Sequence, residues 1–180
     1  MPGLLLTAVV FLMLAAPCLA TAPSPTMNQP IAAAVADFDY FDTSGEAIDQ
    51  SEAHTRRMRT FVEILKQRLV AQAGLQIVEI TCGRPVCSAG SEANAGLIDA
   101  ARQADARLLI YGGIHKMSTL VQWGRVQVLD LDAERLLLDR SFSFRGDNDK
   151  AFERAAGFLV KTLQGVLSST PLSDGPAEAR

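Results

Sequence analysis

The chain has 180 residues, of which 48% are hydrophobic and 21% are charged, and its formal net charge is -3. This length and composition predict a single globular domain and exclude a disordered chain, a collagen and a coiled coil. The slightly negative charge gives no general attraction to nucleic acid or anionic lipid, so we expect no nucleic-acid partner.

The first 20 residues have the pattern of a secretory signal peptide. Residues 4–16 are apolar except for Thr7, and small residues around Ala20 follow Pro17. This run is shorter than the roughly 20 residues that span a membrane as a helix. We therefore expect residues 1–20 to be cleaved, leaving a periplasmic protein without a stable membrane anchor. An uncleaved anchor is the alternative.

Two cysteines remain in the exported chain after Cys18 leaves with the signal peptide. Cys82 and Cys87 are separated by four residues, and in an oxidising compartment such a pair is predicted to form a disulfide. The chain-entropy model gives about 2 kcal/mol for so short a loop, so the bond should stabilise a local turn. A zinc site would need further ligands, and redox-active pairs usually have two intervening residues.

The predicted elements divide the chain into a lead-in, one domain and a tail. Residues 21–30 are rich in proline, threonine and serine and predict a flexible lead-in. The domain should cover residues 31–168, and residues 169–180 should form a disordered tail. We expect strands at residues 31–39, 75–80, 107–111, 120–130 and 136–145, and helices at 51–73 and 92–104 and from Asp147 or Asn148 to 167.

This order of elements predicts an α/β fold with a mixed five-stranded sheet covered by about three helices. The first three strands are joined by two helical crossovers and should be parallel, with the first strand in the middle. The last two strands should form a hairpin that extends one edge of the sheet in the antiparallel direction.

Three apolar stretches resemble the strand signatures of the TolB amino-terminal and CsgG-like periplasmic α/β domains. They are residues 34–38, 104–112 and 126–130. The chain is similar still more closely to a bacterial family of secreted proteins of unassigned function, whose pattern is matched by Cys82, Cys87, Gly112, Lys116 and Ser118. Because these signatures are mostly apolar, the resemblance implies a fold and says little about function.

The candidate ligand or metal site is an acidic segment at the end of the first strand. Asp37, Asp39 and Asp42 lie there, and Glu46 follows. Open α/β sheets often bind ligands at the carboxyl ends of their strands, and carboxylates can bind a divalent cation or act as acid and base. The alternative is a solvated turn, because residues 42–45 have ordinary turn composition.

Two further features are candidate partner-binding surfaces. Arg56, Arg57 and Arg59 give the first long helix a basic face that can dock an acidic partner or anionic headgroups, unless it is simply a solvated face. Trp123 is the only tryptophan and can anchor a protein interface. The alternative for Trp123 is packing beneath the final helix.

The sequence contains no motif that predicts catalysis. It lacks a nucleophile elbow and a phosphate-binding glycine loop, and no motif places a nucleophile beside His115. We therefore predict no catalytic residue, cofactor or resident metal, and interpret the protein as a periplasmic accessory or binding protein with a periplasmic or envelope protein as partner. The alternatives are a small-molecule or metal-binding component of a periplasmic oxidoreductase system and, third, an enzyme that uses the acidic segment.

Overall fold

The structure is a computed structural model that describes residues 30–170. The expected signal peptide (1–20) lies outside the described residues, as do residues 21–29 of the lead-in and residues 171–180 of the tail. The elements of the described part are β1 (Ala32–Val35), β2 (Asp39–Asp42), α1 (Ser51–Ala73), β3 (Gln76–Val78), α2 (Asn94–Gln103), β4 (Leu108–Lys116), β5 (Val121–Asp130), β6 (Arg135–Arg145) and α3 (Asp149–Ser169).

The strands of the described domain form one mixed sheet. Its order is β3-β1-β4-β5-β6, and β2 also pairs with β4. β1 is parallel to β3 and β4, and β2 is parallel to β4. β5 pairs antiparallel with both β4 and β6. The predicted α/β class and mixed sheet with a C-terminal hairpin are confirmed, but the described sheet has six strands where five were expected.

The sixth strand arises because the expected strand at residues 31–39 is interrupted. The N–H of Ala36 still donates to the carbonyl oxygen of Ile110 at 2.9 Å. The N–H of Asp37 donates to the carbonyl oxygen of Cys87 at 2.9 Å. The register against β4 then shifts by one residue, because Val35 is opposite Ile110 whereas Asp39 is opposite Gly113. The chain then resumes pairing with β4 as β2, from Asp39.

β4 is also longer than the expected strand at residues 107–111, because it continues through two glycines to Lys116. A Cβ atom at Gly112 would lie 2.1 Å from the carbonyl oxygen of Arg125 and 2.8 Å from the ring of Phe38. Glycine at this position permits close packing inside the sheet and does not end the strand.

Each long helix has one end that its sequence predicts, the C-terminal end of α1 and the N-terminal end of α3. The N-terminal end of α1 differs from the expected cap at Ser51 or Thr55, because its N-cap is Gln50 and forms no side-chain cap hydrogen bond. α1 ends at Ala73, and Gly74 follows in the left-handed conformation with a φ of 65°. α3 begins after Asn148, whose side chain accepts a hydrogen bond from the N–H of Ala151, so Asn148 is the N-cap and Asp147 is not. None of the described helices combines the length and apolar character needed to cross a bilayer.

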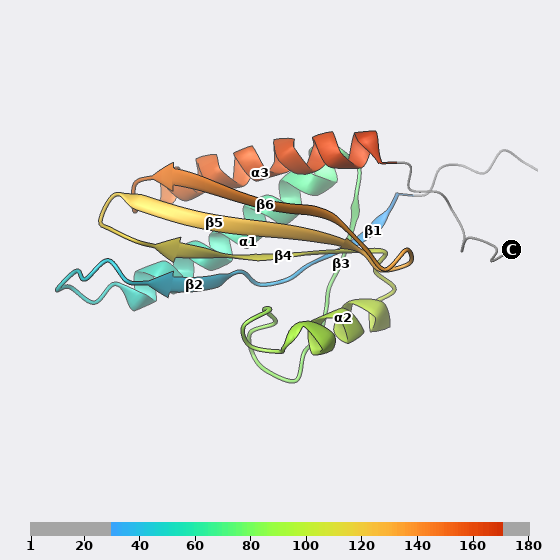
Figure 1. Ribbon diagram of the computed structural model, residues 1–180, viewed down its shortest axis with the longest axis horizontal. Helices are drawn as coiled ribbons and strands as arrows, with labels where there is room; N and C mark the ends of the chain where they lie inside the picture. Colours follow the sequence, from blue (N-terminus) through green and yellow to red (C-terminus); the bar gives the residue numbers. More distant parts are fainter. Residues whose placement is uncertain (1–29, 171–180) are drawn as a thin grey trace, which may run out of the picture.

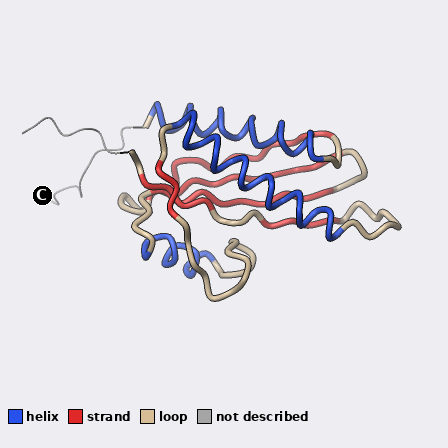
Figure 2. Tube along the Cα trace, turned by 180° about the vertical axis from the view of Figure 1, so that it is seen from behind, coloured by secondary structure: helices blue, strands red, loops and turns tan. Residues whose placement is uncertain are grey.

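The helices cover the two faces of the sheet unequally. α1 and α3 lie side by side along one face, which we call the inner face, as Figure 2 shows. The main core lies there and includes Phe61, Leu65 and Leu159. α2 lies on the outer face, where a smaller core includes Leu97 and Leu109. No described helix covers the outer face near the ends of β2, β4 and β5 that lie far from α2 (Figure 1).

Candidate functional site

The structure separates the three aspartates of the acidic segment. The Asp37 carboxylate accepts a hydrogen bond from the N–H of Cys87 at 2.9 Å. The Asp39 carboxylate accepts hydrogen bonds from the hydroxyl of Ser88 at 2.6 Å and from the N–H of Gly90 at 2.9 Å. Both side chains therefore position the loop that follows the cysteines, whereas Asp42 belongs to a different cluster.

The predicted disulfide is confirmed. Cys82 and Cys87 are bonded, and their Cα atoms are 5.4 Å apart. Cys87 is buried against the smaller core beside α2. Together with the hydrogen bond from Asp37 N–H to the Cys87 carbonyl, the disulfide fixes this loop against the edge of the sheet between β1 and β2.

A charged cluster surrounds Lys116, the last residue of β4. Its side chain is fully buried, and its Nζ lies 2.6 Å from Glu46 Oε2, 2.7 Å from Asp147 Oδ2 and 3.6 Å from Asp42 Oδ2. The ion pairs join the end of β4 to the end of β2, to the loop before α1 and to the loop before α3. We call these residues, together with His54 and Arg57, the Lys116 cluster.

Two side chains from the first turns of α1 complete the Lys116 cluster. The Nε2 atom of the buried His54 lies 2.9 Å from Asp147 Oδ2, and its Nδ1 lies 3.9 Å from Asp42 Oδ2. Arg57 contacts the other oxygen of Asp147 at 2.5 Å and Asp149 at 3.0 Å. Asp147 thus holds the start of α3 against the start of α1.

The ion pairs of the Lys116 cluster shift the pKa values of its members. Burial lowers the pKa of Lys116, but hydrogen bonds to Asp147 and Glu46 outweigh it and raise the pKa above its usual value. Burial raises the pKa of Asp147, but hydrogen bonds from Lys116 and His54 outweigh it and lower the pKa below its usual range. Burial, followed by the nearby charge of Asp147, raises the pKa of Tyr40 to about 12. At neutral pH, Lys116 and Asp147 are both charged and Tyr40 is neutral.

The arrangement of these carboxylates suits internal ion pairing. Lys116 Nζ occupies the point at which Asp42, Glu46 and Asp147 meet. Within residues 30–170, no group of three or more His, Cys, Asp or Glu side chains is arranged to hold a metal ion. The predicted candidates Asp37, Asp39 and Asp42 therefore form no joint metal site in this part of the chain.

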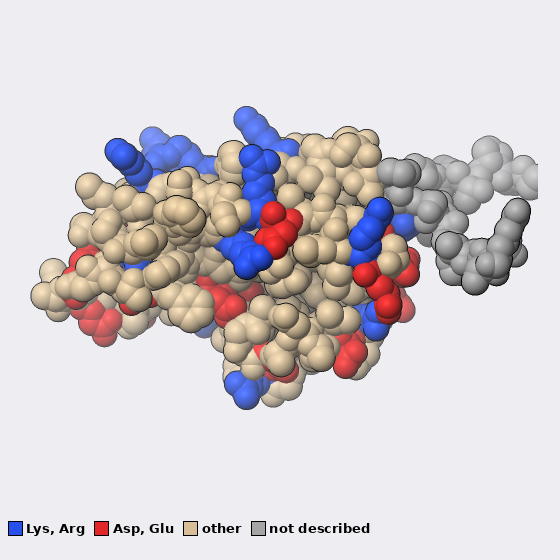
Figure 3. Space-filling view, in the orientation of Figure 1, with Lys and Arg blue, Asp and Glu red and all other residues tan. Residues whose placement is uncertain are grey.

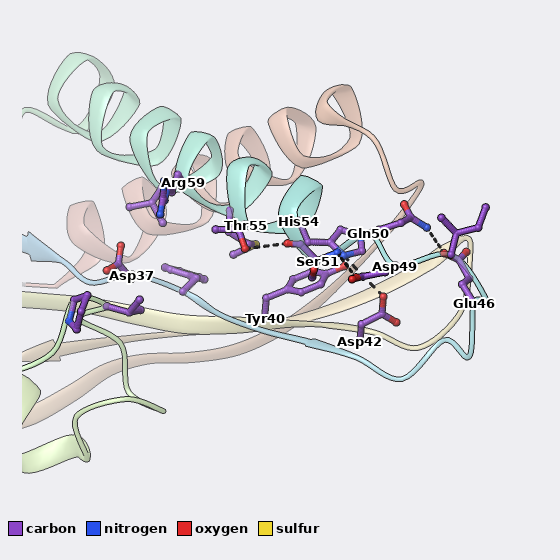
Figure 4. Close-up of a pocket in the computed structure, with 16 residues that line it drawn as sticks. Asp37, Tyr40, Asp42, Glu46, Asp49, Gln50, Ser51, His54, Thr55 and Arg59 are labelled. Carbon is purple, nitrogen blue, oxygen red and sulfur yellow. Dashed lines mark hydrogen bonds and ion pairs between the residues drawn. The ribbon is translucent and has the colours of Figure 1, made fainter.

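A groove of about 820 Å³ runs beside the Lys116 cluster. It lies between α1 and the strand segment from Asp37 to Asp42, with Asp37 and Arg59 at one end and Glu46 at the other (Figure 4). Its volume is within the range of protein ligand pockets. It is lined by Asp37, Phe38, Tyr40, Asp42, Glu46, Ile48, Asp49, Gln50, Ser51, His54, Thr55, Met58, Arg59, Val62, Pro85 and Val86.

The three arginines predicted to form a basic face have different surroundings. Arg56 is exposed and pairs with Glu52 at 2.7 Å. The Arg57 side chain is only 13% exposed and is engaged by two aspartates of the α3 start. Arg59 is exposed and lines the groove. A role for these residues in binding an acidic partner stays a prediction, and Arg57 has a structural role as well.

Trp123 does not pack beneath α3, so that alternative is wrong. It is 51% exposed on β5. The place beside it on the inner face is taken by Phe142, because a Cβ atom at the neighbouring Gly124 would lie 2.2 Å from the Phe142 ring. The close approach at Gly124 thus lets Phe142 pack inward, while Trp123 points to the outer face.

Trp123 is part of a row of three ring side chains across the outer face. Phe41 of β2 is directly opposite His115 of β4, which is directly opposite Trp123 of β5. Phe41 is 58% exposed, and the Nε2 atom of His115 lies 2.7 Å from the hydroxyl oxygen of Thr43. We call Phe41, His115 and Trp123 the outer aromatic row.

Sequence reasoning missed the Lys116 cluster. Lys116 was noted only as part of the family resemblance, and Asp147 only as a possible helix cap. A usable signal was present, since Leu108, Ile110 and Ile114 are two or four residues apart and face inward, so the same alternation places Lys116 inside. Nothing local to His54 predicts its contact with Asp147, which is 93 residues away.

Residues 31–163 match the model of a family described as "Protein of unknown function (DUF2380)". The chain belongs to this family. The match spans nearly all of the described DUF2380 domain and agrees with the expected similarity to a family of unassigned function. No curated protein matches the sequence.

Solved structures are similar to the chain at low sequence identity. The hypothetical protein CT253 from Chlamydia trachomatis has a TM-score of 0.55 at 12% identity, covering 78% of this chain and 99% of that chain. The PelC dodecamer from Paraburkholderia phytofirmans has a TM-score of 0.48 at 13% identity, over 81% and 93% of the two chains. TolB from Acinetobacter baumannii has a TM-score of 0.47 at 12% identity, over 80% of this chain and 30% of that chain. CT253 shows the fold alone, and the other two similarities are too distant to bear on function.

Proposed function

We propose that this DUF2380 protein is a secreted periplasmic accessory protein that binds another envelope protein and performs no catalysis. The observation that supports the proposal is the outer aromatic row. Its two strongest hydrophobic members, Phe41 and Trp123, are more than half exposed on a part of the sheet that no described helix covers. Met117 and Leu120, exposed by 52% and 65%, extend the apolar surface into the turn between β4 and β5.

This surface has the properties of a protein interface. Buried tryptophan is among the residues that contribute most to binding energy, and contiguous exposed apolar patches mark interaction sites. Figure 3 views the outer face and shows a wide area without charged side chains over the ends of the strands far from α2. A partner that covers the outer aromatic row would remove this surface from water beside Arg125, whose charge is already paired with that of Asp139.

The cellular location is proposed from two features of the chain. The apolar segment at residues 4–16 has the length of a signal-peptide core. The Cys82–Cys87 disulfide is the form that a cysteine pair takes in an oxidising compartment. Both features support export to the periplasm, where the expected partner is also located.

The proposal can be tested by removing the outer aromatic row. The variant that combines Phe41→Ala with Trp123→Ala should fold normally, because both side chains are exposed, and should no longer co-purify the partner that the wild-type protein binds in the periplasm. Phe158→Ala is the matched control, since Phe158 is 45% exposed on α3, on the other side of the sheet. Equal recovery of the same partner by the double variant and the wild type would contradict the proposal.

A further inference from the structure

β2 has one side that pairs with no other strand among the described residues. It pairs with β4, whereas β3 pairs only with β1 and ends its register at Ala34. The last backbone hydrogen bond on this side joins Asp37 N–H to the carbonyl oxygen of Cys87. β2 is therefore an edge strand. The unpaired backbone groups of an edge strand can serve as a template for the addition of another strand.

The pairing with β4 shows which backbone groups are free. The N–H of Thr43 donates to the carbonyl oxygen of Lys116 at 2.9 Å. Because successive residues of a strand direct their backbone groups to opposite sides, Phe41 also pairs with β4, and Tyr40 and Asp42 direct their N–H and C=O groups away from it. These groups form the free edge of β2.

The free edge is one wall of the groove described above. The N-terminal half of α1 forms the other wall, and Figure 4 shows this helix running alongside the strand. Phe38, Met58 and Val62 make the inner lining apolar. Val86 and Ile48, exposed by 50% and 77%, also line the groove. An edge strand beside a helix, with an apolar space between them, is the arrangement in which β-augmentation receives an extended peptide.

The charged side chains that line the groove indicate which charge a bound peptide should carry. Asp49 lines the groove and accepts a hydrogen bond from the N–H of Ser51, but no described cation forms an ion pair with it. Asp42 and Glu46 lie nearby, and Lys116 already pairs with both. The exposed cation of the lining, Arg59, lies at the Asp37 end of the groove, away from Asp49 (Figure 4). A basic side chain on the peptide would complement Asp49.

The same charges disfavour a second copy of this chain as the occupant. Edge-to-edge pairing of two β2 strands through the free backbone groups of Asp42 would bring the Asp42 side chains of the two copies close together. Like charges opposite one another on neighbouring strands are destabilising.

We propose that this groove binds an extended segment of a partner protein, which adds to the free edge of β2 as a strand, places apolar side chains between β2 and α1, and sets a lysine or arginine against Asp49. The site is separate from the outer aromatic row, because its lining faces α1 on the inner side of the sheet. The proposed peptide site therefore goes beyond the proposed function, and the two can be tested independently.

The test uses the full exported chain and a fluorescein-labelled peptide of alternating valine and lysine, with binding measured by fluorescence anisotropy. The proposal expects saturable binding. One alternate set of peptide N–H groups faces the edge, so binding should be lost in one of two methylated peptides, one methylated at every valine nitrogen and the other at every lysine nitrogen. A peptide of alternating valine and glutamate should bind at least about tenfold more weakly. Undiminished binding of both methylated peptides, or no saturable binding of the unmethylated valine–lysine peptide, would overturn the proposal.

Two variants and one spectroscopic readout locate the peptide. Asp49→Asn keeps the hydrogen-bond acceptor and removes the charge, so it should weaken peptide binding severalfold, whereas the matched control Asp99→Asn on α2 should not.

Hydrogen exchange of the Tyr40 and Asp42 amides should slow when the peptide binds. Unchanged exchange at both amides, or concentration-dependent dimerisation that protects them without peptide, would reject the partner segment as occupant. Trp123→Ala should leave peptide binding unchanged, which separates this test from that of the proposed function.

Discussion

At the ends of β2, β4 and β5, the two faces of the sheet have the reverse of the usual polarity. The inner face, beneath the helices, carries Asp42, Lys116 and Gln122 in one row. The outer aromatic row lies one residue away along each strand and faces open space. The same strands supply both rows, because neighbouring residues of a strand point to opposite faces.

The difference separates a structural role from a binding role. Burying ions costs free energy, and their pairing offsets this cost only when every partner is present. The Lys116 cluster therefore makes the positions of four separate segments depend on one lysine. The exposed aromatic rings gain little from folding, because most of their surface remains in water, so their contribution is expected when a partner covers them.

The largest effect is expected when the inner row loses its central cation. Lys116→Met keeps the apolar stem but leaves the carboxylates of Asp42 and Asp147 without it, and removal of one partner from a buried ion pair typically costs about 3–5 kcal/mol. Urea denaturation should show this loss in the free energy of unfolding. Adding Asp147→Asn to Lys116→Met should cost less than the sum of the two single changes, since the two side chains interact directly.

A change below about 1 kcal/mol for Lys116→Met would contradict the structural role of the Lys116 cluster, because that is the size expected for an exposed ion pair.

Acid should also weaken the Lys116 cluster. The pKa of Asp147 is lower in the folded protein than its usual value. Its ion pairs therefore stabilise the fold at a pH above the unfolded pKa of about 3.9, and this stabilisation is lost as the pH falls through the folded pKa. Melting temperatures measured from neutral pH down to about pH 3 should fall more steeply for the wild type than for Asp147→Asn, which cannot titrate. Parallel curves would assign acid sensitivity to other carboxylates.

Local sequence patterns predicted the features of the fold that depend only on residues close together in the chain. The repeat of Met58, Phe61 and Leu65 defined α1, Gly74 ended it, and two alternating segments gave the hairpin of β5 and β6. The disulfide followed from the number of cysteines and the compartment. These features need no knowledge of how distant segments meet.

The Lys116 cluster could not be predicted in the same way. The strand expected at residues 107–111 stops before Gly112, although close packing against Arg125 and Phe38 explains the glycine at this position. The extension of β4 to Lys116 was thus missed, and its ion-pair partner Asp147 is 31 residues away. The groove was missed for a related reason, because it depends on the interruption between β1 and β2.

A smaller effect is expected at the cysteine loop. Combining Cys82→Ser with Cys87→Ser should lower the free energy of unfolding by about 2 kcal/mol at most, because the bond closes a short loop. The circular dichroism spectrum should stay that of the wild type. An unfolded double variant would mean that the loop holds the whole domain together, in conflict with its place at one edge of the sheet.

The smallest effect on stability is expected on the outer face. Trp123→Ala should change the free energy of unfolding by about 0.5 kcal/mol or less, because exposed substitutions away from special features rarely exceed this value. Urea denaturation under the conditions used for Lys116→Met gives the comparison directly. A loss as large as that of Lys116→Met would show that Trp123 serves folding, and the reversed polarity would then carry no functional meaning.

Site-specific photo-crosslinking in living cells tests the binding role of the outer face most directly. A photoreactive amino acid placed at residue 123 on the outer face should give one covalent adduct of constant mass with an envelope protein. The same group at residue 158 of α3, on the opposite side of the sheet, should not. No adduct from residue 123, or the same adduct from both residues, would contradict the claim that the protein acts through its outer aromatic row.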